Sequence, residues 1–342
     1  MHKSNMKNYK VSFIRSSYQR FFQRHKKELL KAIEKCLSQG NLILGDEVEK
    51  FEKTLAKYVG TKYAVGLNSG TDALILAIQA LGIQNKTIVT SGHTFWATIE
   101  AILQTQNKVK FADIDPFTGL LDMKVWDKTG YLIPVHIAGQ VCEFRDNVII
   151  DDACQAMGAI KNPTSDVQAW SFYPAKILGA FGDSGAITTN NKEVYEKILN
   201  LRNHGGKPHP TGVGYNSRLD NLQAAILNIK FKYLPYFIKR RQQIAKQYDS
   251  GLKNLRLTLP VKRKVYQDYI ILTSLRNELQ SFLTTNGVET LKDEYPFPVT
   301  FAKPLHAKNW ETMALRLPCN PELTNSEIQY VIKKIKEFYD RK

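Results

Sequence analysis

The sequence predicts an α/β protein, with a large domain built on a mostly parallel sheet and a smaller C-terminal α+β domain. Short apolar strands alternate with helices over the first part of the chain, and segments such as YLIPV and NVII are apolar nearly throughout. Strands buried on both faces have this pattern. A long helical stretch interrupted at Pro235 then leads into a different pattern. We therefore predict domains at residues 1–235 and 236–342.

The first elements follow from apolar spacing and from the residues that end each segment. Two N-terminal helices have apolar residues at helical spacing and a glycine beyond the last turn, which suits a helix C-terminus. Strands and helices then alternate up to the middle of the chain. The predicted helices cover residues 17–40, 46–60 and 95–106 and the segment NSGTDALILAIQALG, and the predicted strands cover 63–67, 87–91, 108–114, 131–137 and 147–152.

The second half continues with a strand in GAITT and a helix over residues 191–204 that ends at Gly205. The segment from GYNSRLDNLQ to IAKQY is helical on both sides of Pro235. In the C-terminal unit, the pattern predicts a strand at 266–273 and helices at 278–286 and 328–339. Thr324 and Glu327 have the spacing of a capping box that opens the last helix.

Composition limits the class of protein. The chain has 342 residues, 43% of them hydrophobic, and contains neither an apolar run long enough to span a bilayer nor a signal-peptide pattern, so a cytoplasmic location is expected. Its net charge of +16 favours anionic ligands, but the basic residues are spread over helix faces, which argues against nucleic-acid binding. The four cysteines form no CxxC pair, so we expect neither a metal site nor a disulfide framework.

One lysine has unusual neighbours. Lys176 lies in SFYPAKILGAFGDSGA, among Phe172, Tyr173, Pro174, Ile177, Leu178 and Phe181. If these side chains surround the amine, burial disfavours its protonated form and leaves a nucleophile suited to imine chemistry. The alternative is a surface lysine that lies over an apolar patch.

Two further features are expected at the carboxyl edge of the sheet, where ligands bind in α/β proteins. The amides of Ser69, Gly70 and Thr71 begin a helix and form an anion site, unless SGT is an ordinary N-cap. Asp152 ends a buried strand, where a carboxylate needs a cation or hydrogen-bond donors. Because successive side chains alternate, Asp151 should point to the opposite face.

These parts, together with the aromatic Phe95, are those that a pyridoxal phosphate site requires. Along nearly its whole length the chain resembles the DegT-type (DegT/DnrJ/EryC1/StrS) sugar aminotransferases, which are pyridoxal-phosphate enzymes of fold type I. The resemblance lies in segments including NLILGDEVEKFEKTLAKYVGTKYAVGLNSGTDAL, TFWATIEAI, PVHIAGQ, IDDACQAMGA, SFYPAKILGAFGDSGAI, RNHG, GYNSRLDNLQAAIL and PELTNSEIQYVI.

The resemblance implies a role for each matching position. Lys176 would bind the cofactor covalently and then carry the proton, and Asp152 would keep the pyridine nitrogen protonated. The other implied contacts are Phe95 stacked on the ring, Gly70, Thr71 and Ser171 at the phosphate, Gln155 at the phenolic oxygen, and Asn216 reaching the phosphate from the neighbouring subunit of a homodimer.

The resemblance also implies transfer of an amino group from an amino acid, with glutamate the expected donor, to a keto sugar on a nucleotide. Within the family, the sequence SFYPAK followed by LGAFGDSGA resembles enzymes that act on 3-keto sugars more than those that act on 4-keto sugars. A small keto or cyclitol substrate without a nucleotide is an alternative. Sugar deoxygenation is disfavoured because those relatives have histidine in place of Lys176, and a regulator that binds nucleic acid is disfavoured by the complete cofactor set.

The chain departs from the family where substrate contacts are expected. The segments 122–131 and 141–147 are short, and Ala138, Met157 and Glu294 replace residues common in the family. The sugar and the nucleotide therefore stay open. Cys154, beside Asp152, is expected to fill space rather than react.

Overall fold

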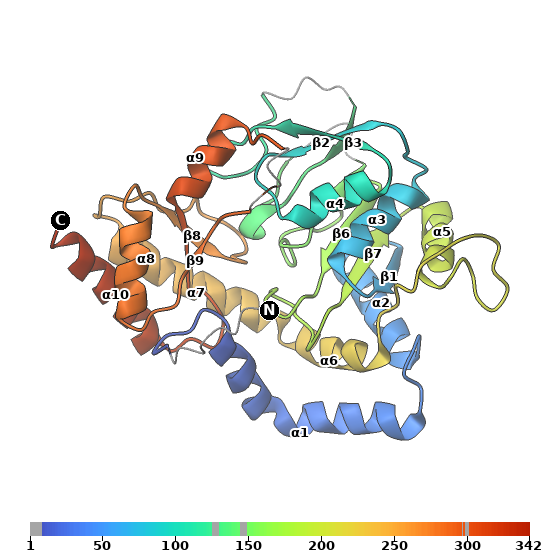
Figure 1. The fold of residues 1–342 in the computed structure, drawn as a ribbon. Coiled ribbons are helices and arrows are strands. Elements are labelled where there is room, and N and C mark those ends of the chain that lie inside the picture. The colour runs from blue at the N-terminus through green and yellow to red at the C-terminus, as the bar shows by residue number, and fades with distance from the viewer. Residues whose placement is uncertain (1–8, 125–129, 144–148, 296, 298–300) are drawn as a thin grey trace.

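The computed structural model describes residues 9–124, 130–143, 149–295, 297 and 301–342. Within these residues, helices and strands alternate through the first half of the chain, as Figure 1 shows. The helices are α1 (Arg15–Gln39), α2 (Asp46–Val59), α3 (Gly70–Ala80), α4 (Trp96–Gln104), α5 (Lys192–Arg202), α6 (Asn221–Lys232), α7 (Leu234–Leu252), α8 (Arg276–Thr285), α9 (Leu305–Met313) and α10 (Asn325–Tyr339), with a 3-10 turn at Ile137–Gly139.

The large sheet is mixed but mostly parallel. Two hydrogen-bonded groups, β1-β7-β6-β5 and β3-β2-β4, are joined where Val135 bridges Asp152 in parallel. Only β7 runs antiparallel to its neighbours among these described strands. The strands are β1 (Tyr63–Leu67), β2 (Thr87–Ser91), β3 (Lys108–Ala112), β4 (Tyr131–Ile133), β5 (Ile150–Asp152), β6 (Val167–Ser171) and β7 (Gly185–Thr189).

Alternating side chains give this sheet two covered faces. Val65 of β1 packs with apolar residues of α3 and α5, whereas its neighbour Ala64 packs with residues of α2 and α6. Ile150 of β5 belongs to the α3 face, so Asp152, two residues later, lies on that face as well. Strand alternation thus directs Asp152 towards the helices that follow β1 and β2.

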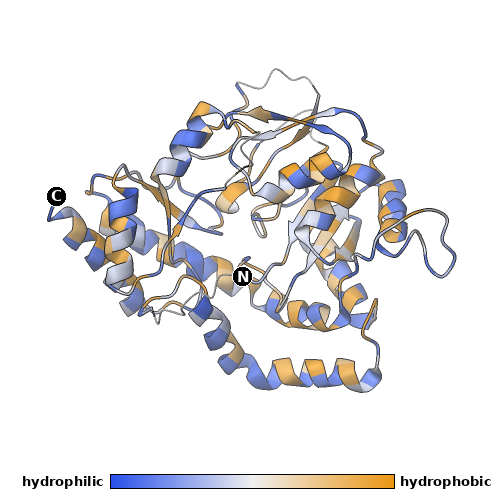
Figure 2. Cartoon of the chain, viewed as in Figure 1, coloured by the Kyte–Doolittle hydropathy of each residue, from blue (hydrophilic) through white to orange (hydrophobic). Residues whose placement is uncertain are grey.

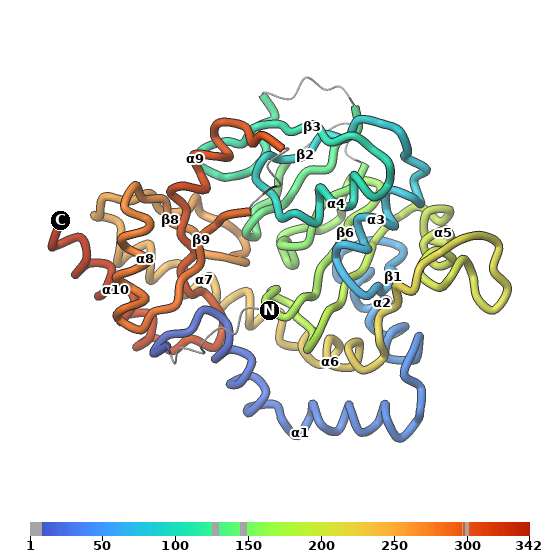
Figure 3. Tube along the Cα trace, in the orientation of Figure 1, coloured from blue at the N-terminus to red at the C-terminus, as the bar shows by residue number. Residues whose placement is uncertain are grey.

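The smaller unit has an antiparallel sheet, ordered β8-β10-β9 (Tyr269–Leu272, Ala314–Leu317 and Leu291–Lys292), packed with α7, α8 and α10. The N-terminal segment belongs to this core too, because Val11 is buried there and bridges Val288. Figure 3 shows the blue N-terminal segment beside orange and red parts of the chain. Figure 2 shows α1 with alternating hydrophilic and hydrophobic residues, as expected of a helix with one buried face.

Most predicted elements are found with small shifts of their ends. The predicted strand at 131–137 stops at Ile133, and residues 147–148 of the next one lie outside the described part of the chain. The long helical stretch predicted from Gly214 begins only at Asn221 and divides at Tyr233. Pro235 stands in the first turn of α7, where no intrahelical N–H is required. The capping box of Thr324 and Glu327 is present.

Four elements, β6, β9, β10 and α9, were not predicted. The sequence of β6, VQAWS, was not recognised as a buried strand because Gln168 interrupts its apolar residues. Gln168 is nevertheless buried, since its side chain forms hydrogen bonds with Ser165 and Thr188. The division into domains at residue 235 stays a prediction: α7 contributes Leu234 to the core of the large unit and Ile244 to that of the small unit. In the described part of the chain no helix is long and apolar enough to cross a membrane, and the cytoplasmic location stays a prediction.

Candidate active site

The N-terminus of α3 meets the ends of two strands at the edge of the large sheet. Ser69 caps the helix by accepting a hydrogen bond from the Asp72 amide at 3.1 Å, so the N–H groups of Gly70 and Thr71 precede the first intrahelical donor. Gly70 fits closely here: a Cβ at this position would lie 2.8 Å from the Ser171 Cβ and 2.9 Å from the Cys154 Sγ. This helix start therefore lies directly against the ends of β5 and β6.

Asp152 at the end of β5 is buried, with 5% of its surface exposed. One carboxylate oxygen accepts from the Thr98 hydroxyl of α4 at 2.7 Å, and the other accepts from the Cys154 amide at 3.2 Å. The side chain of Asp151 faces the other way and contacts the Ser165 hydroxyl and the His136 ring. The predicted alternation is confirmed.

Phe95 and Gln155 approach the same edge from α4 and from the segment after β5. Phe95 is the N-cap residue of α4 and is 59% exposed, and its ring makes a T-shaped contact with the Tyr295 ring. The Gln155 Oε1 accepts from the Ala138 amide at 2.8 Å, and its Nε2 donates to the Tyr295 hydroxyl at 3.3 Å. The Ala138 bond fixes the orientation of the amide and makes the nitrogen end a donor.

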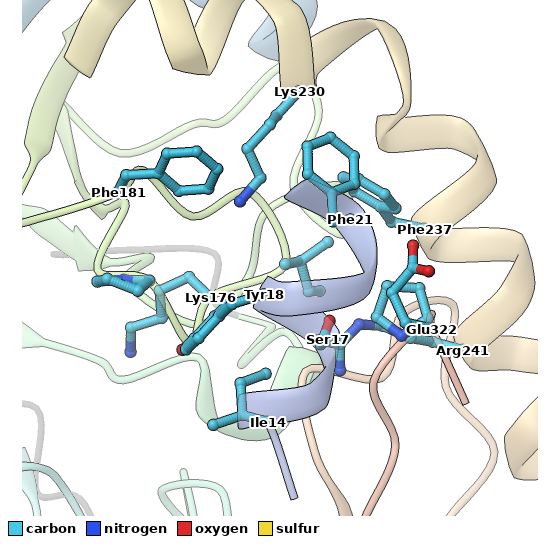
Figure 4. A pocket seen from close by; sticks show the side chains of 13 residues that line it. Ile14, Ser17, Tyr18, Phe21, Lys176, Phe181, Lys230, Phe237, Arg241 and Glu322 are labelled. Carbon is cyan, nitrogen blue, oxygen red and sulfur yellow. The ribbon is translucent and has the colours of Figure 1, made fainter. Parts of the chain in front are cut away.

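Lys176 follows β6 and is only partly buried in the chain. Phe172, Ile177 and Leu178 are buried as expected, but Tyr173 is about half exposed and Phe181 lies at the surface. The prediction that all six neighbours enclose the amine is therefore wrong for Tyr173 and Phe181. The turn after Phe172 faces the edge of the sheet and not the core. Figure 4 shows Lys176 on the wall of a pocket into which Lys230 points from α6.

Asn216 precedes Ser217, whose hydroxyl donates to the Asn68 Oδ1 at 3.1 Å. Asn216 lies between α5 and α6, is exposed, and its backbone bridges Asn203. Figure 1 shows the connection from α5 to α6 extending away from the body of the molecule. Its expected reach into a neighbouring subunit stays a prediction.

Comparison with known proteins shows which family the chain belongs to. Residues 23–336 match the DegT/DnrJ/EryC1/StrS aminotransferase family. The chain belongs to this family. Its enzymes depend on pyridoxal phosphate and have fold type I, as the resemblance implied. The described sheet, with one antiparallel strand among parallel ones, is the observed form of that fold.

Relatives of similar sequence identity have names that refer to different roles. A protein of Geobacillus stearothermophilus named "Pleiotropic regulatory protein" is 36% identical over 93% of this chain and 96% of its own length. The dTDP-3-amino-3,4,6-trideoxy-alpha-D-glucose transaminase of Streptomyces venezuelae is 34% identical over 91% and 92%. Among solved structures, S. venezuelae DesV superposes with a TM-score of 0.90 at 31% identity, covering 98% of this chain and 99% of DesV.

The residues present fit the family's cofactor. The amides at the start of α3 suit a phosphate, and the absence of a side chain at Gly70 lets this helix start pack directly against Ser171 and Cys154. The Phe95 side chain is exposed, so part of its ring surface is available for stacking. Within the described residues, the Asp152 carboxylate accepts from a hydroxyl and an amide, which leaves it able to pair with a protonated ring nitrogen.

The structure shows the surroundings of the residues that depart from the family pattern. Ala138 has a left-handed backbone with φ of 55° in the 3-10 turn, and Met157 is buried in the core beneath the site. Glu294 pairs with Arg276 at 2.6 Å. The Cys154 Sγ lies 3.7 Å from the Ala169 carbonyl, and burial together with Asp152 raises the pKa of its thiol well above the ordinary value. Cys154 therefore stays a neutral thiol in this packing.

Three side chains near the site were not predicted from the sequence. Thr98 bonds Asp152, Gln267 bonds the backbone beside Lys176, and Lys230 is buried with a pKa lowered by burial to about 8. Thr98 and Gln267 each bond a residue that lies 54 or more positions away in the sequence. A local sequence pattern therefore could not predict these contacts. For Lys230 a signal existed, since NLQAAILNIKFK places it in an apolar helix segment.

Proposed function

We propose that this chain transfers an amino group from an amino acid, with L-glutamate the expected donor, to a nucleotide-linked keto sugar. The observation that carries the proposal is the meeting of four elements at one sheet edge: the start of α3, the start of α4, and the ends of β5 and β6. When bound there, pyridoxal phosphate supplies an aldehyde that accepts the amino group and a ring that withdraws electrons.

Each residue of the chain then has a task that its position permits. The Lys176 amine would hold the cofactor at its aldehyde carbon and, when free, would carry a proton between the α carbon of the amino acid and that cofactor carbon. Asp152, held by Thr98, keeps a proton on the ring nitrogen. Phe95 covers one face of the ring.

The remaining contacts anchor the other groups of the cofactor. Gly70, Thr71 and Ser171 hold the phosphate at the helix N-terminus. The Nε2 of Gln155, oriented by the Ala138 amide, donates to the phenolic oxygen. Asn216 reaches the phosphate of a second copy, so the active unit is a homodimer with shared sites, supported by the exposed position of this residue between α5 and α6.

The substrate proposal is a 3-keto sugar nucleotide. It is supported by the segment ILGAFGDSGA after Lys176 and by the name of the S. venezuelae relative, which refers to a 3-amino sugar. The excess of basic residues suits a diphosphate. The 4-keto sugar nucleotide and the small keto or cyclitol substrate are the alternatives within transamination.

The Lys176→Ala variant tests the chemistry. Wild-type protein loaded with pyridoxal phosphate should absorb in the visible range and retain the cofactor covalently after borohydride reduction, located at Lys176 by peptide mass. Lys176→Ala should lose the bond, whereas Lys230→Met, which replaces a buried amine that lines the same pocket, should keep it. A reducible bond that survives in Lys176→Ala contradicts the proposal.

Substrate choice needs a separate measurement. The pyridoxamine-phosphate form is mixed with matched 3-keto and 4-keto sugar nucleotides and with a nucleotide-free keto cyclitol, and the amino product is quantified by mass spectrometry. The 3-keto sugar nucleotide should react fastest. The Geobacillus relative is named as a regulatory protein. If this chain were a regulator without transaminase activity, it would aminate none of these substrates and would leave glutamate unconverted.

A further inference from the structure

Gln267 of the small unit contacts the backbone on both sides of Lys176. This side chain stands just before β8 and is buried, with 7% of its surface exposed. Its Oε1 accepts from the Ile177 amide at 2.9 Å, and its Nε2 donates to the Ala175 carbonyl at 3.0 Å. One partner is a donor and the other an acceptor, so the amide has a single orientation, and both of its ends are used.

The backbone of Gln267 extends this contact to the Gln155 side of the site. Its N–H donates to the Ala138 carbonyl at 3.2 Å, and the Ala138 N–H donates to the Gln155 Oε1 at 2.8 Å. The Arg263 guanidinium also bonds the Ala138 carbonyl, at 3.1 Å. One residue of the small unit thus joins the Lys176 loop to the segment that orients Gln155.

The turn at Ala138 shows how closely the two units fit here. Ala138 has a φ of 55°, a conformation that a residue with a Cβ keeps only where its surroundings determine it. At the next position, a Cβ on Gly139 would lie 2.5 Å from the Val265 carbonyl. The segment from Arg263 to Gln267 therefore packs on this turn at backbone distance, with no room for a side chain between them.

We propose that Gln267 is a positioning residue that fixes the peptide groups flanking Lys176, so that the amine reaches the cofactor's aldehyde carbon in a reactive geometry. The Lys176 amide already donates to the Tyr173 carbonyl at 2.8 Å, and Gln267 adds the bonds on either side. A lysine has a long flexible stem, and a fixed backbone limits where its amine can lie. This inference rests on the proposed role of Lys176.

The test separates positioning from binding by using two forms of the cofactor. Pyridoxamine phosphate makes the phosphate and ring contacts but cannot bond covalently to lysine, whereas pyridoxal phosphate can. Gln267→Met keeps the length of the side chain and removes both hydrogen bonds, and Gln267→Glu keeps the acceptor for Ile177 but cannot donate to Ala175. Gln242→Met is the matched control, because Gln242 bonds the Lys264 carbonyl of the same segment and does not touch the Lys176 loop.

Both Gln267 variants should form the borohydride-reducible bond to pyridoxal phosphate on the order of 10- to 100-fold more slowly than wild type. Their dissociation constants for pyridoxamine phosphate, measured by calorimetry, should change less than about 3-fold, a difference of about 0.6 kcal/mol. The glutamate half-reaction should lose kcat with little change in KM. Gln242→Met should match wild type in every measurement.

Two results would overturn the proposal. Bond formation at the wild-type rate in Gln267→Met shows that the contact has no part in positioning. Loss of pyridoxamine phosphate binding in both variants, together with a lowered melting temperature, shows that Gln267 only holds the two units together. Failure of the proposed function is distinguishable, because the wild-type protein itself would then form no reducible bond at Lys176.

Discussion

Two buried carboxylates, Asp152 and Asp293, differ in the partners that the fold gives them. Asp293 is fully buried, and its oxygens accept from the His93 Nε2 at 3.0 Å, the Arg316 Nε at 2.7 Å and the Trp310 Nε1 at 3.0 Å. Asp152 is almost as buried but accepts from a hydroxyl and an amide in the described part of the chain. One carboxylate is neutralised by cations of the protein, and the other is held by neutral donors.

The difference separates a structural carboxylate from one that is available to a ligand. Burial alone would raise the pKa of Asp293, but Arg316 and His93 hold it well below the ordinary value. These partners come from β10 and from the segment after β2, so Asp293 ties the small unit to the large sheet. Removing an ionised group from water costs several kcal/mol unless a cation compensates. In the proposed function, the protonated ring nitrogen of the cofactor is that cation for Asp152.

Replacing each carboxylate by its amide should give opposite effects, and this is the largest contrast we expect. Asp152→Asn should lower the glutamate half-reaction at least about 100-fold, because a charge that stabilises the reacting ring is lost, with a melting temperature near that of wild type. Asp293→Asn should cost about 3–5 kcal/mol of folding free energy, because Arg316 and His93 are left without their anion. Activity assays and denaturant titrations of both variants measure this contrast.

Asp151 supplies the control, since it neighbours Asp152 and lies on the other face of β5. Asp151→Asn should leave the half-reaction within a few-fold of wild type and lower stability instead. The comparison fails if Asp152→Asn is as active as Asp151→Asn, or if Asp152→Asn destabilises the fold as much as Asp293→Asn does.

Thr98 sharpens the comparison, because its hydroxyl donates directly to the Asp152 carboxylate. Thr98→Val preserves shape and removes the hydroxyl, so the carboxylate loses a bond to a charged group. We expect the glutamate half-reaction to slow on the order of 10-fold, with a shift in the pH profile of the cofactor's absorbance. Thr90→Val is the control, because the buried Thr90 hydroxyl bonds the Ile133 carbonyl at 2.9 Å in the same sheet. Equal activity of the two variants would show that Thr98 is only a packing residue.

The sequence was sufficient to predict the parts of this comparison that depend on local pattern. The alternation of β5 placed Asp151 and Asp152 on opposite faces, and the strands at 63–67 and 87–91 have the predicted ends. The partners of the carboxylates were not predictable. Thr98 and Asp152 are 54 positions apart and His93 and Asp293 are 200 apart, and only tertiary packing brings them together.

The loop around Lys176 also shows that a local sequence pattern does not predict tertiary contacts. Its apolar composition predicted an enclosed amine, but composition does not say which side chains of a turn face the core, and Tyr173 and Phe181 do not. The bonds from Gln267 that hold this loop come from 90 or more positions away. A local pattern therefore made Lys176 a candidate, whereas only the fold determines its surroundings.

The smallest expected effect concerns how the stability of the Asp293 cluster depends on pH. Burial alone would lower the pKa of His93, but Asp293 and Glu311 raise it above the ordinary value of 6.5. A raised pKa in the folded protein means that His93 contributes its full stability below about pH 6.5 and loses it as the pH rises through the folded pKa. Asp152 has no such histidine partner in the described residues, so this dependence should belong to the Asp293 side alone.

Urea titrations of wild type and His93→Gln between about pH 6 and 9 measure this contribution. The wild-type free energy of unfolding should fall with rising pH relative to the variant, by up to about 1.4 kcal/mol per pH unit, and the difference between the two curves should shrink. Asp152→Asn in the wild-type background should leave the slope unchanged, because its carboxylate lies outside the cluster. Parallel curves for wild type and His93→Gln would mean that folding does not shift the pKa of His93, and therefore that Arg316 alone neutralises Asp293.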